Sequence, residues 1–247
     1  MISRRELLVG CTCGCLAATA VGMVAVPALA KDSTSDALPS EIGGVRVPDS
    51  ALAKAVTALV REASPDPLFN HVTRSYVFAS KLGEAKKLKF DSELLFVAAM
   101  MHDLGLTERY MAAARFEVDG ADAAAKILRD RNYPESKIDI VWEAIALHST
   151  MEIPERRGPE VALLHLGVFM DGGYRADSLP RALLDEVFET VPRLQNRAHL
   201  IEALGAVLRK KPHTAYLAFQ KDIALRKVPN FNPPNFCDIV PPSPFDR

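Results

Sequence analysis

Cysteine is scarce in this chain, and it is unevenly placed. Cys11, Cys13 and Cys15 lie near the N-terminus, and only Cys237 lies beyond them. After the N-terminal segment there is therefore no pair that could form an intramolecular disulfide. The chain also lacks the set of thiolates that a structural zinc site requires, so a bound metal would need imidazole and carboxylate ligands.

The chain also has no excess of charge of one sign and no sequence repeats. The formal net charge is -1, which gives no electrostatic reason to expect a nucleic-acid partner. There is no internal repeat, no long run of like charges and no sustained alternation of apolar and polar residues. What is present, 49% hydrophobic and 25% charged residues in a chain of 247, suffices for one well-filled globular domain with appendages.

The N-terminal residues have the features of an export signal. Arg4 and Arg5 precede a weakly hydrophobic run over residues 7–26, and small residues at 28 and 30 suit a cleavage site after Ala30. The pattern predicts a twin-arginine-type signal over residues 1–30, hence a periplasmic or secreted protein with no stable membrane anchor after cleavage. A retained membrane-spanning anchor and a lipoprotein cut before Cys11 are the weaker alternatives.

The rest of the chain divides into a linker, a helical domain and a tail. Residues 31–48 are polar and contain a Gly pair, and the Pro-rich residues 227–247 read as an extended strap. The domain over residues 49–226 is expected to be all-α, because apolar residues recur at helical spacing throughout. The expected helices cover residues 50–62, 68–86, 91–103, 121–131, 134–148, 159–171, 180–191, 196–209 and 213–226.

The third of these helices ends in an unusual pair. An apolar run over residues 96–101 leads directly into His102-Asp103, followed by Leu-Gly. One reading is an ordinary helix end, with a capping His and a surface Asp. However, His102 continues the apolar face of Leu95 and Ala98, and Asp103 lies about 100° further round the helix, so both can reach one buried point from a shared edge.

Other helices offer further metal ligands. His71 lies on the second helix, His148 late in the fifth and Asp171 at the end of the sixth. Helical bundles build metal sites from facing side chains of this kind, and imidazole with carboxylate suits Zn, Fe, Mn, Ni or Co. Structural roles compete for each residue: a core histidine, a helix-end hydrogen bond, or a carboxylate at a helix terminus. Glu117 could likewise be a helix cap or a substrate-facing carboxylate.

The order of these residues resembles a known metal-binding signature. A His, an adjacent His-Asp pair and a distal Asp resemble the HD-domain superfamily of metal-dependent hydrolases. Three longer blocks, over residues 115–121, 141–150 and 159–163, look like the branch that includes cyanamide hydratases. The similarity covers roughly residues 50 to 220. It implies an all-α HD-type helical bundle with the metal site in its core.

The resemblance also implies roles for single residues. His71, His102, Asp103 and Asp171 would hold one divalent metal ion, with Zn or Fe favoured over Mn, Ni or Co. His148, Asp103 and Glu117 are the candidate catalytic residues, His148 as a proton donor or substrate-orienting group. A second metal held by His148 is the weaker alternative. The remaining histidines are interpreted as structural or surface residues: His165, His199 and His213.

For activity, the resemblance implies a hydratase or hydrolase that uses metal-activated water on a small nitrile-like molecule such as cyanamide. A phosphohydrolase or phosphodiesterase is the alternative, for which Lys126, Arg129 and Arg175 could be recruited to a phosphate. A third possibility is an exported metal-binding protein without turnover. The expected partner is a small-molecule substrate, and a homo-oligomer is compatible with the sequence.

Overall fold

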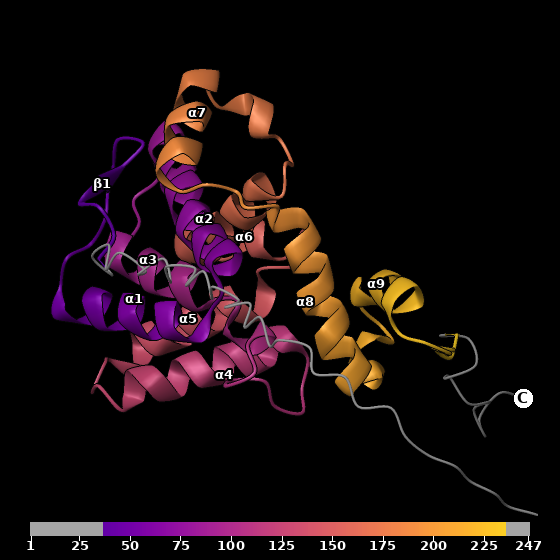
Figure 1. The fold of residues 1–247 in the computed structure, drawn as a ribbon. Helices are drawn as coiled ribbons and strands as arrows, with labels where there is room; N and C mark the ends of the chain where they lie inside the picture. Colours follow the sequence, from indigo (N-terminus) through magenta and orange to yellow (C-terminus); the bar gives the residue numbers. More distant parts are fainter. Residues whose placement is uncertain (1–36, 236–247) are drawn as a thin grey trace, which may run out of the picture. The chain divides into compact units, whose positions relative to one another are not determined.

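The structure, a computed structural model, describes residues 37–235, which are mostly helical (Figure 1). The described helices are α1 (Ala51–Ala63), α2 (Asp66–Ala85), α3 (Ser92–Met101), α4 (Phe116–Arg129), α5 (Glu135–Leu147), α6 (Pro159–Asp171), α7 (Arg181–Thr190), α8 (Asn196–Lys210) and α9 (Gln220–Lys227). Four short 3-10 helices connect them: η1 (Leu104–Leu106), η2 (Pro154–Arg156), η3 (Ala176–Ser178) and η4 (Pro212–Ala215). The predicted all-α fold is confirmed. The predicted export signal over residues 1–30, with its cleavage after Ala30, lies outside the described residues, as does Cys237.

The helix starts follow from local capping chemistry. The Ser50 side chain accepts a hydrogen bond from the Ala53 amide at the start of α1. The Asp91 carboxylate does the same for the Leu94 amide at the start of α3. Such side chains satisfy amides that have no partner within the helix, so α1 and α3 begin where the sequence predicts.

Helix α3 lies in the centre of the hydrophobic core. Its residues from Leu94 to Met101 are all buried, and it contacts α1, α2, α5 and α6. A helix that is apolar on every side has no face to offer to solvent, so it is covered all round. This burial carries the end of α3, where the His-Asp pair lies, into the interior of the protein.

Helices α2 and α6 cross closely and run antiparallel. Gly167 permits the close approach, because a Cβ atom there would lie 2.3 Å from the Ser75 carbonyl oxygen and 2.8 Å from the Ala79 Cβ. One turn towards the N-terminus of α2 from Ser75 lies His71, and one turn towards the C-terminus of α6 from Gly167 lies Asp171. The crossing therefore brings the ends of the two helices, and these two side chains, together.

Three segments differ from expectation. Within the stretch assigned to a linker, β1 (Glu41–Ile42) and β2 (Val45–Arg46) form a hairpin whose inner residues are buried. Gly43 and Gly44 both have positive φ, the backbone of a two-residue turn whose twist suits a hairpin. Helix α4 begins at Phe116, earlier than the helix expected from residue 121, and the expected helix at 213–226 is broken into η4 and α9.

Helix α8 covers one end of the α2–α3 region. It contacts α2, η1 and α9, and α8 and α9 lie next to each other in Figure 1. Lys211, directly after α8, is buried and donates to the carbonyl oxygens of Ala112 and Ala114 and to the Asp119 carboxylate. The C-terminal helices are thus tied to the start of α4. Across residues 37–235, no helix combines the length and the apolarity needed to span a bilayer.

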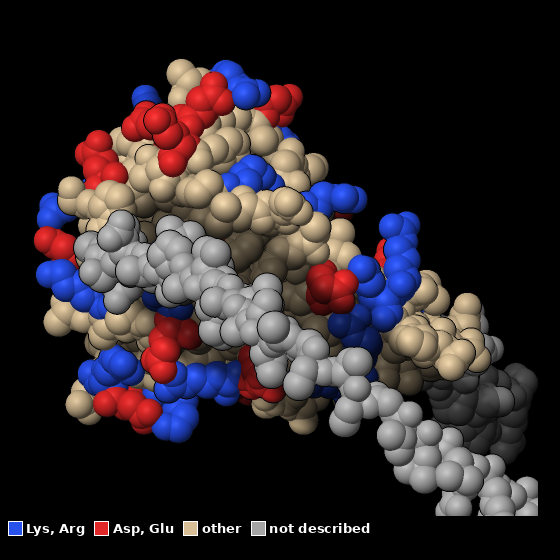
Figure 2. All heavy atoms as spheres, in the orientation of Figure 1, with Lys and Arg blue, Asp and Glu red and all other residues tan. Residues whose placement is uncertain are grey.

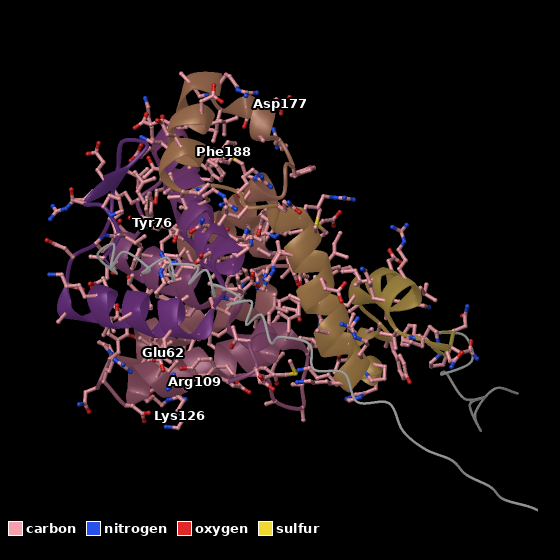
Figure 3. All side chains as sticks on the ribbon, in the orientation of Figure 1. Glu62, Tyr76, Arg109, Lys126, Asp177 and Phe188 are labelled. Atoms are coloured by element: carbon pink, nitrogen blue, oxygen red, sulfur yellow. The ribbon has the colours of Figure 1, made fainter. Side chains whose placement is uncertain are left out.

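Charged side chains of both signs are intermixed on the face seen in Figure 2. Many of them pair, as Arg109 does with Glu62 at 3.1 Å (Figure 3). Lys126, also labelled in Figure 3, lies on the exposed side of α4 and pairs with Asp130 at 2.7 Å. Exposed pairs of this kind contribute about 0 to 1 kcal/mol each, so the fold depends chiefly on its apolar core.

Candidate metal centre

The residues predicted for the site lie at helix ends that meet in the core. His102 caps the C-terminus of α3, and Asp103 follows it in the turn before η1. His148 caps the C-terminus of α5, and Asp171 is the last residue of α6. His71 lies in the second turn of α2. All five are buried, between 0 and 4% exposed.

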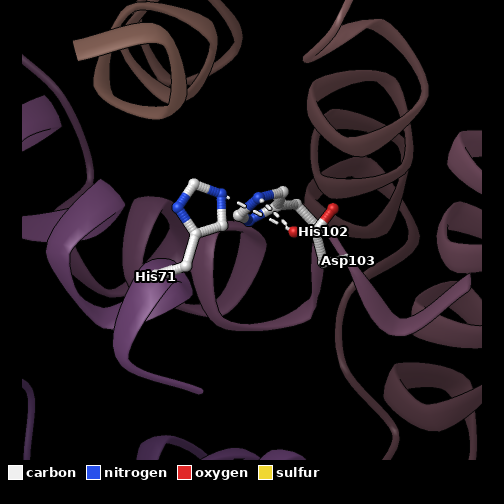
Figure 4. Close-up of side chains that lie close together, drawn as sticks. All are labelled: His71, His102 and Asp103. Atoms are coloured by element: carbon white, nitrogen blue, oxygen red, sulfur yellow. Dashed lines mark ion pairs between the residues drawn. The ribbon is translucent and has the colours of Figure 1, made fainter. Parts of the chain in front are cut away.

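His71, His102 and Asp103 form a compact cluster (Figure 4). One ligand atom of each lies within 4.8 Å of the others. The Asp103 Oδ2 atom is 3.3 Å from His102 Nε2 and 3.6 Å from His71 Nε2. The structure thus brings together these three residues of the predicted ligand set.

The hydrogen bonds at the far side of each ring determine which nitrogen faces the cluster with a lone pair. His102 Nδ1 donates to the Ala99 carbonyl at 2.7 Å, and His148 Nδ1 donates to the Ile145 carbonyl at 2.7 Å. His71 Nδ1 lies 2.7 Å from the Asp171 carboxylate, which can only accept. The neutral form of each ring therefore carries its lone pair on Nε2.

The three Nε2 atoms lie around the Asp103 carboxylate, which is itself a hydrogen-bond acceptor. The Nε2 atom of His148 lies 3.8 Å from Asp103 Oδ1, so three imidazoles surround this one carboxylate. His102 Nε2 is buried without a hydrogen-bond partner among the described residues. Buried acceptors that face each other without a donor are costly, and a cation between them removes that cost. The donor set, imidazole nitrogen with carboxylate oxygen, fits a divalent transition metal.

The electrostatics of the cluster favour a charged carboxylate and a neutral His148. Burial would raise the pKa of Asp103, but its charge interaction and hydrogen bond with His102 hold it well below its usual range. Burial would lower the pKa of His102, but Asp103 raises it, so without a metal ion a proton on His102 supplies the positive charge that the carboxylate needs. Burial, aided by the neighbouring His102, lowers the pKa of His148 to about 4. His148 is therefore uncharged near neutral pH and keeps its Nε2 lone pair.

Asp171 lies next to His71, on the side away from the cluster. Its two oxygens accept both a Nε–H (2.6 Å) and a Nη2–H (2.9 Å) bond from the buried guanidinium of Arg74. Arg193 and Asn196 donate to it as well, at 3.2 Å each. Burial would raise the pKa of Asp171, but Arg74 and His71 hold it well below its usual range. In this arrangement Asp171 orients the His71 ring, as carboxylates behind metal-binding histidines do.

Glu117 is close to the site but does not line its cavity. Its Oε1 atom accepts bonds from Arg115 (2.8 Å), Ser149 (2.6 Å) and Gln220 (2.6 Å). Ser149 does line the cavity, next to His148. Through these bonds, Glu117 links the loop after α5 to the start of α9.

A cavity of about 350 Å³ opens onto the cluster. His71, Asp103 and His148 line it together with Ser149. The rest of the lining is almost entirely apolar or aromatic: Leu106, Phe116, Val168, Phe169, Gly172, Tyr174, Leu200, Leu204 and Phe219. The arrangement can therefore hold a small molecule with a polar end at the cluster and an apolar body against the walls.

Sequence reasoning missed the residues that support and enclose the site. Arg74 could have been found, because it lies three residues after His71 on the same side of α2. Asn196, Gln220 and the wall residues of α8 carry no local signal, since their role depends on long-range packing. Of the remaining histidines, His165 is buried and donates to the His148 carbonyl at 2.8 Å, His199 is half-buried and His213 is exposed.

Comparison with known proteins agrees with this geometry. The family model of the HD domain matches residues 68–186, which include His71, the His102-Asp103 pair and Asp171. No curated protein matches the chain.

Proposed function

We propose, from the HD domain that residues 68–186 form, that this protein is a metal-dependent enzyme that adds water to a small uncharged molecule with a nitrile-like group. The HD-type fold expected from the sequence is confirmed, and it is the fold of metal-dependent hydrolases. The observation that carries the proposal is the convergence of three imidazole nitrogens on the Asp103 carboxylate at the bottom of an apolar cavity.

His71, His102 and Asp103 would hold one divalent ion, Zn or Fe by donor type. When bound, such an ion lowers the pKa of a water molecule it binds, which supplies a nucleophile near neutral pH. Asp171 keeps the His71 ring in place from behind. His148, uncharged and directed into the cavity through Nε2, accepts a hydrogen bond from water and so orients it.

The proposed reaction needs no further reactant. Addition of one water to R–C≡N forms a C–O bond, breaks one C–N π bond and moves one proton to nitrogen, which gives R–C(OH)=NH. Tautomerisation then moves the second proton from oxygen to nitrogen and replaces the remaining C–N π bond by a C–O π bond, which gives the amide R–C(=O)NH₂. Ser149 lies in the cavity wall and its hydroxyl donates to Glu117, so its oxygen keeps lone pairs that can accept a hydrogen bond from a bound donor. Together His148 and Ser149 provide polar contacts at the reacting end of the substrate.

A phosphoester substrate is the rival, and the cavity disfavours it. Among the described residues that line the cavity there is no Lys or Arg. Arg129 pairs with Glu135 at 2.9 Å on the surface, and Arg175 lines a separate pocket beside Leu82. Buried Arg74 is already engaged by Asp171. A phosphate in the cavity would thus lack the charge-assisted hydrogen bonds that phosphate sites rely on.

Metal analysis and a substrate screen test the proposal. The purified protein should contain about one equivalent of metal, and His102→Ala and Asp103→Ala should contain almost none. His213→Ala, which changes an exposed histidine, is the matched control and should keep the metal. The loaded protein is then assayed with cyanamide, simple nitriles and phosphoesters. Turnover of phosphoesters alone would establish the rival chemistry, and no turnover at all would leave a metal-binding protein without this activity.

A further inference from the structure

We infer that the substrate carries an aromatic or branched-alkyl body, and that helix α8 and the residue before α9 select it. The inference rests on the proposed reaction for the polar end of the substrate, but the shape and lining of the cavity define the apolar end. It goes beyond the HD domain itself, because the selecting residues lie after residue 186, where the family match ends.

The size of the cavity is the first argument. Cyanamide has three non-hydrogen atoms and benzonitrile has eight, and at less than the roughly 30 Å³ share of a water molecule for each atom, cyanamide fills under roughly 90 Å³ and benzonitrile more than twice as much as cyanamide. The cavity measures about 350 Å³. A molecule as small as cyanamide would leave most of it to water molecules with apolar neighbours, whereas an aryl nitrile would displace them.

The chemistry of the walls is the second argument. Leu200 and Leu204 of α8 line the cavity, and Phe116, Phe169 and Phe219 supply aromatic surface. Leu204 is buried in a satellite core with Leu106 and Phe116, so this part of the wall is packed from behind. Burial of an apolar group against such a wall is favourable in proportion to the surface removed from water.

Buried hydrogen bonds fix the position of the C-terminal helices, which line part of the cavity, relative to the metal cluster. Lys211 anchors the end of α8 to the loop before α4, and Gln220 anchors the start of α9 to Glu117. Both anchors are buried side chains. Because these bonds fix α8 and Phe219 relative to the cluster, the distance between the reacting end and the apolar end of a substrate is fixed too.

Charge gives the third argument. The lining offers one buried carboxylate and, among the described residues, no cation. An anionic body would therefore be desolvated without a partner, at a cost that a neutral body of the same shape avoids. The substrate class is thus an uncharged nitrile-type molecule on an apolar body.

A substrate series with a cavity-filling variant tests the inference. The loaded protein should hydrate benzonitrile with a kcat/KM about 10- to 100-fold above that for cyanamide, the range expected for burial of one large apolar group. 4-Cyanobenzoate, of the same shape but anionic, should react at least tenfold more slowly than benzonitrile. Leu200→Trp should lower the ratio of benzonitrile to cyanamide kcat/KM at least tenfold. Leu217→Trp, at an exposed leucine outside the cavity, is the matched control.

A binding measurement separates the two proposals. Ligand-observed NMR should detect benzamide, the product, on the wild-type protein and on Leu217→Trp, with binding at least tenfold weaker on Leu200→Trp. If cyanamide is hydrated as well as benzonitrile or better, the reaction stands and the inference on the substrate fails. If no nitrile is hydrated, the proposed reaction fails, and benzamide binding decides: binding that Leu200→Trp weakens supports the apolar site, and no binding overturns it.

Discussion

Replacing Arg74 by Met should destabilise the protein by about 3 to 5 kcal/mol, the cost of leaving a buried charge without its partner. The side chains of Arg74 and Asp171 are both 0% exposed and share two hydrogen bonds of 2.6 and 2.9 Å. With Arg74 gone, the Asp171 carboxylate loses its one fully buried cation and keeps the longer pair with partly exposed Arg193, at 3.2 Å, besides its bonds from His71 and Asn196. Because a domain of this kind is stable by about 5 to 15 kcal/mol, the single variant should be near the limit of folding.

Replacing both Arg74 and Asp171 separates the cost of the unpaired carboxylate from the cost of the other hydrogen bonds that are lost. In Arg74→Met with Asp171→Leu no unpaired charge remains, and such replacements are often neutral or better. Arg74 also donates to the carbonyls of Val191 and Pro192, at 3.2 and 2.8 Å. Those bonds are lost in both variants and cancel in the comparison, but Asp171→Leu leaves the buried His71 Nδ1–H without its acceptor, which costs about 1 to 3 kcal/mol. The double variant should therefore recover about 2 kcal/mol relative to Arg74→Met.

The same double variant tests the role of Asp171 at the metal. In the structure this carboxylate orients His71 through a 2.7 Å hydrogen bond and lies outside the three-residue cluster. Loss of such a supporting carboxylate lowers metal affinity by about 10- to 100-fold. The resemblance to the HD superfamily instead implies a direct ligand, whose loss should abolish binding as His102→Ala does.

Urea unfolding of the metal-free proteins measures the stabilities, with Arg74→Met and Asp171→Leu as the single variants. Competition with a chelator then measures the metal affinity of each folded variant. A folded double variant with no measurable metal would refute the supporting role and make Asp171 a ligand. An Arg74→Met cost under about 1 kcal/mol would refute the estimate of the buried charge.

Two further predictions concern the capping of α3 and the N-terminus. Asp91→Ala should cost about 1 kcal/mol in urea unfolding, because the carboxylate caps α3, whereas Asp91→Asn keeps the cap and should cost less. Burial would raise the pKa of Asp91, but its hydrogen bond to Lys137 lowers it. The charged pair therefore stabilises the fold at pH values above the ordinary Asp pKa, and this stabilisation is lost as the pH falls through the lower pKa of the folded protein. Asp91→Asn should lack this pH dependence. Residues 1–35 should export a fused reporter, and changing Arg4 and Arg5 to Lys should stop it; export that survives the change would contradict a twin-arginine signal.

Local patterns in the sequence were enough for the helices and for the centre of the site. Helical spacing and capping residues such as Ser50 and Asp91 act within one turn, so they can be read without knowing the fold. An apolar helix that ends in His102-Asp103 must bury its end, because α3 has no polar face. The Gly43-Gly44 hairpin is equally local, but the polar composition of residues 31–48 and the Gly pair predict a linker, and each strand is only two residues long.

Only the tertiary structure decided which residues support the candidate ligands and which residues line the cavity with them. Arg74 and Asp171 are 97 residues apart, and Gln220 and Glu117 are 103 residues apart, so no local pattern predicts their hydrogen bonds. The contact between His71 Nδ1 and the Asp171 carboxylate depends on the close packing of α2 and α6 at Gly167. The apolar wall from α8 likewise arises from packing alone, since Leu200 and Leu204 resemble any leucines on an amphipathic helix until the fold places them in the lining of the same cavity as Asp103.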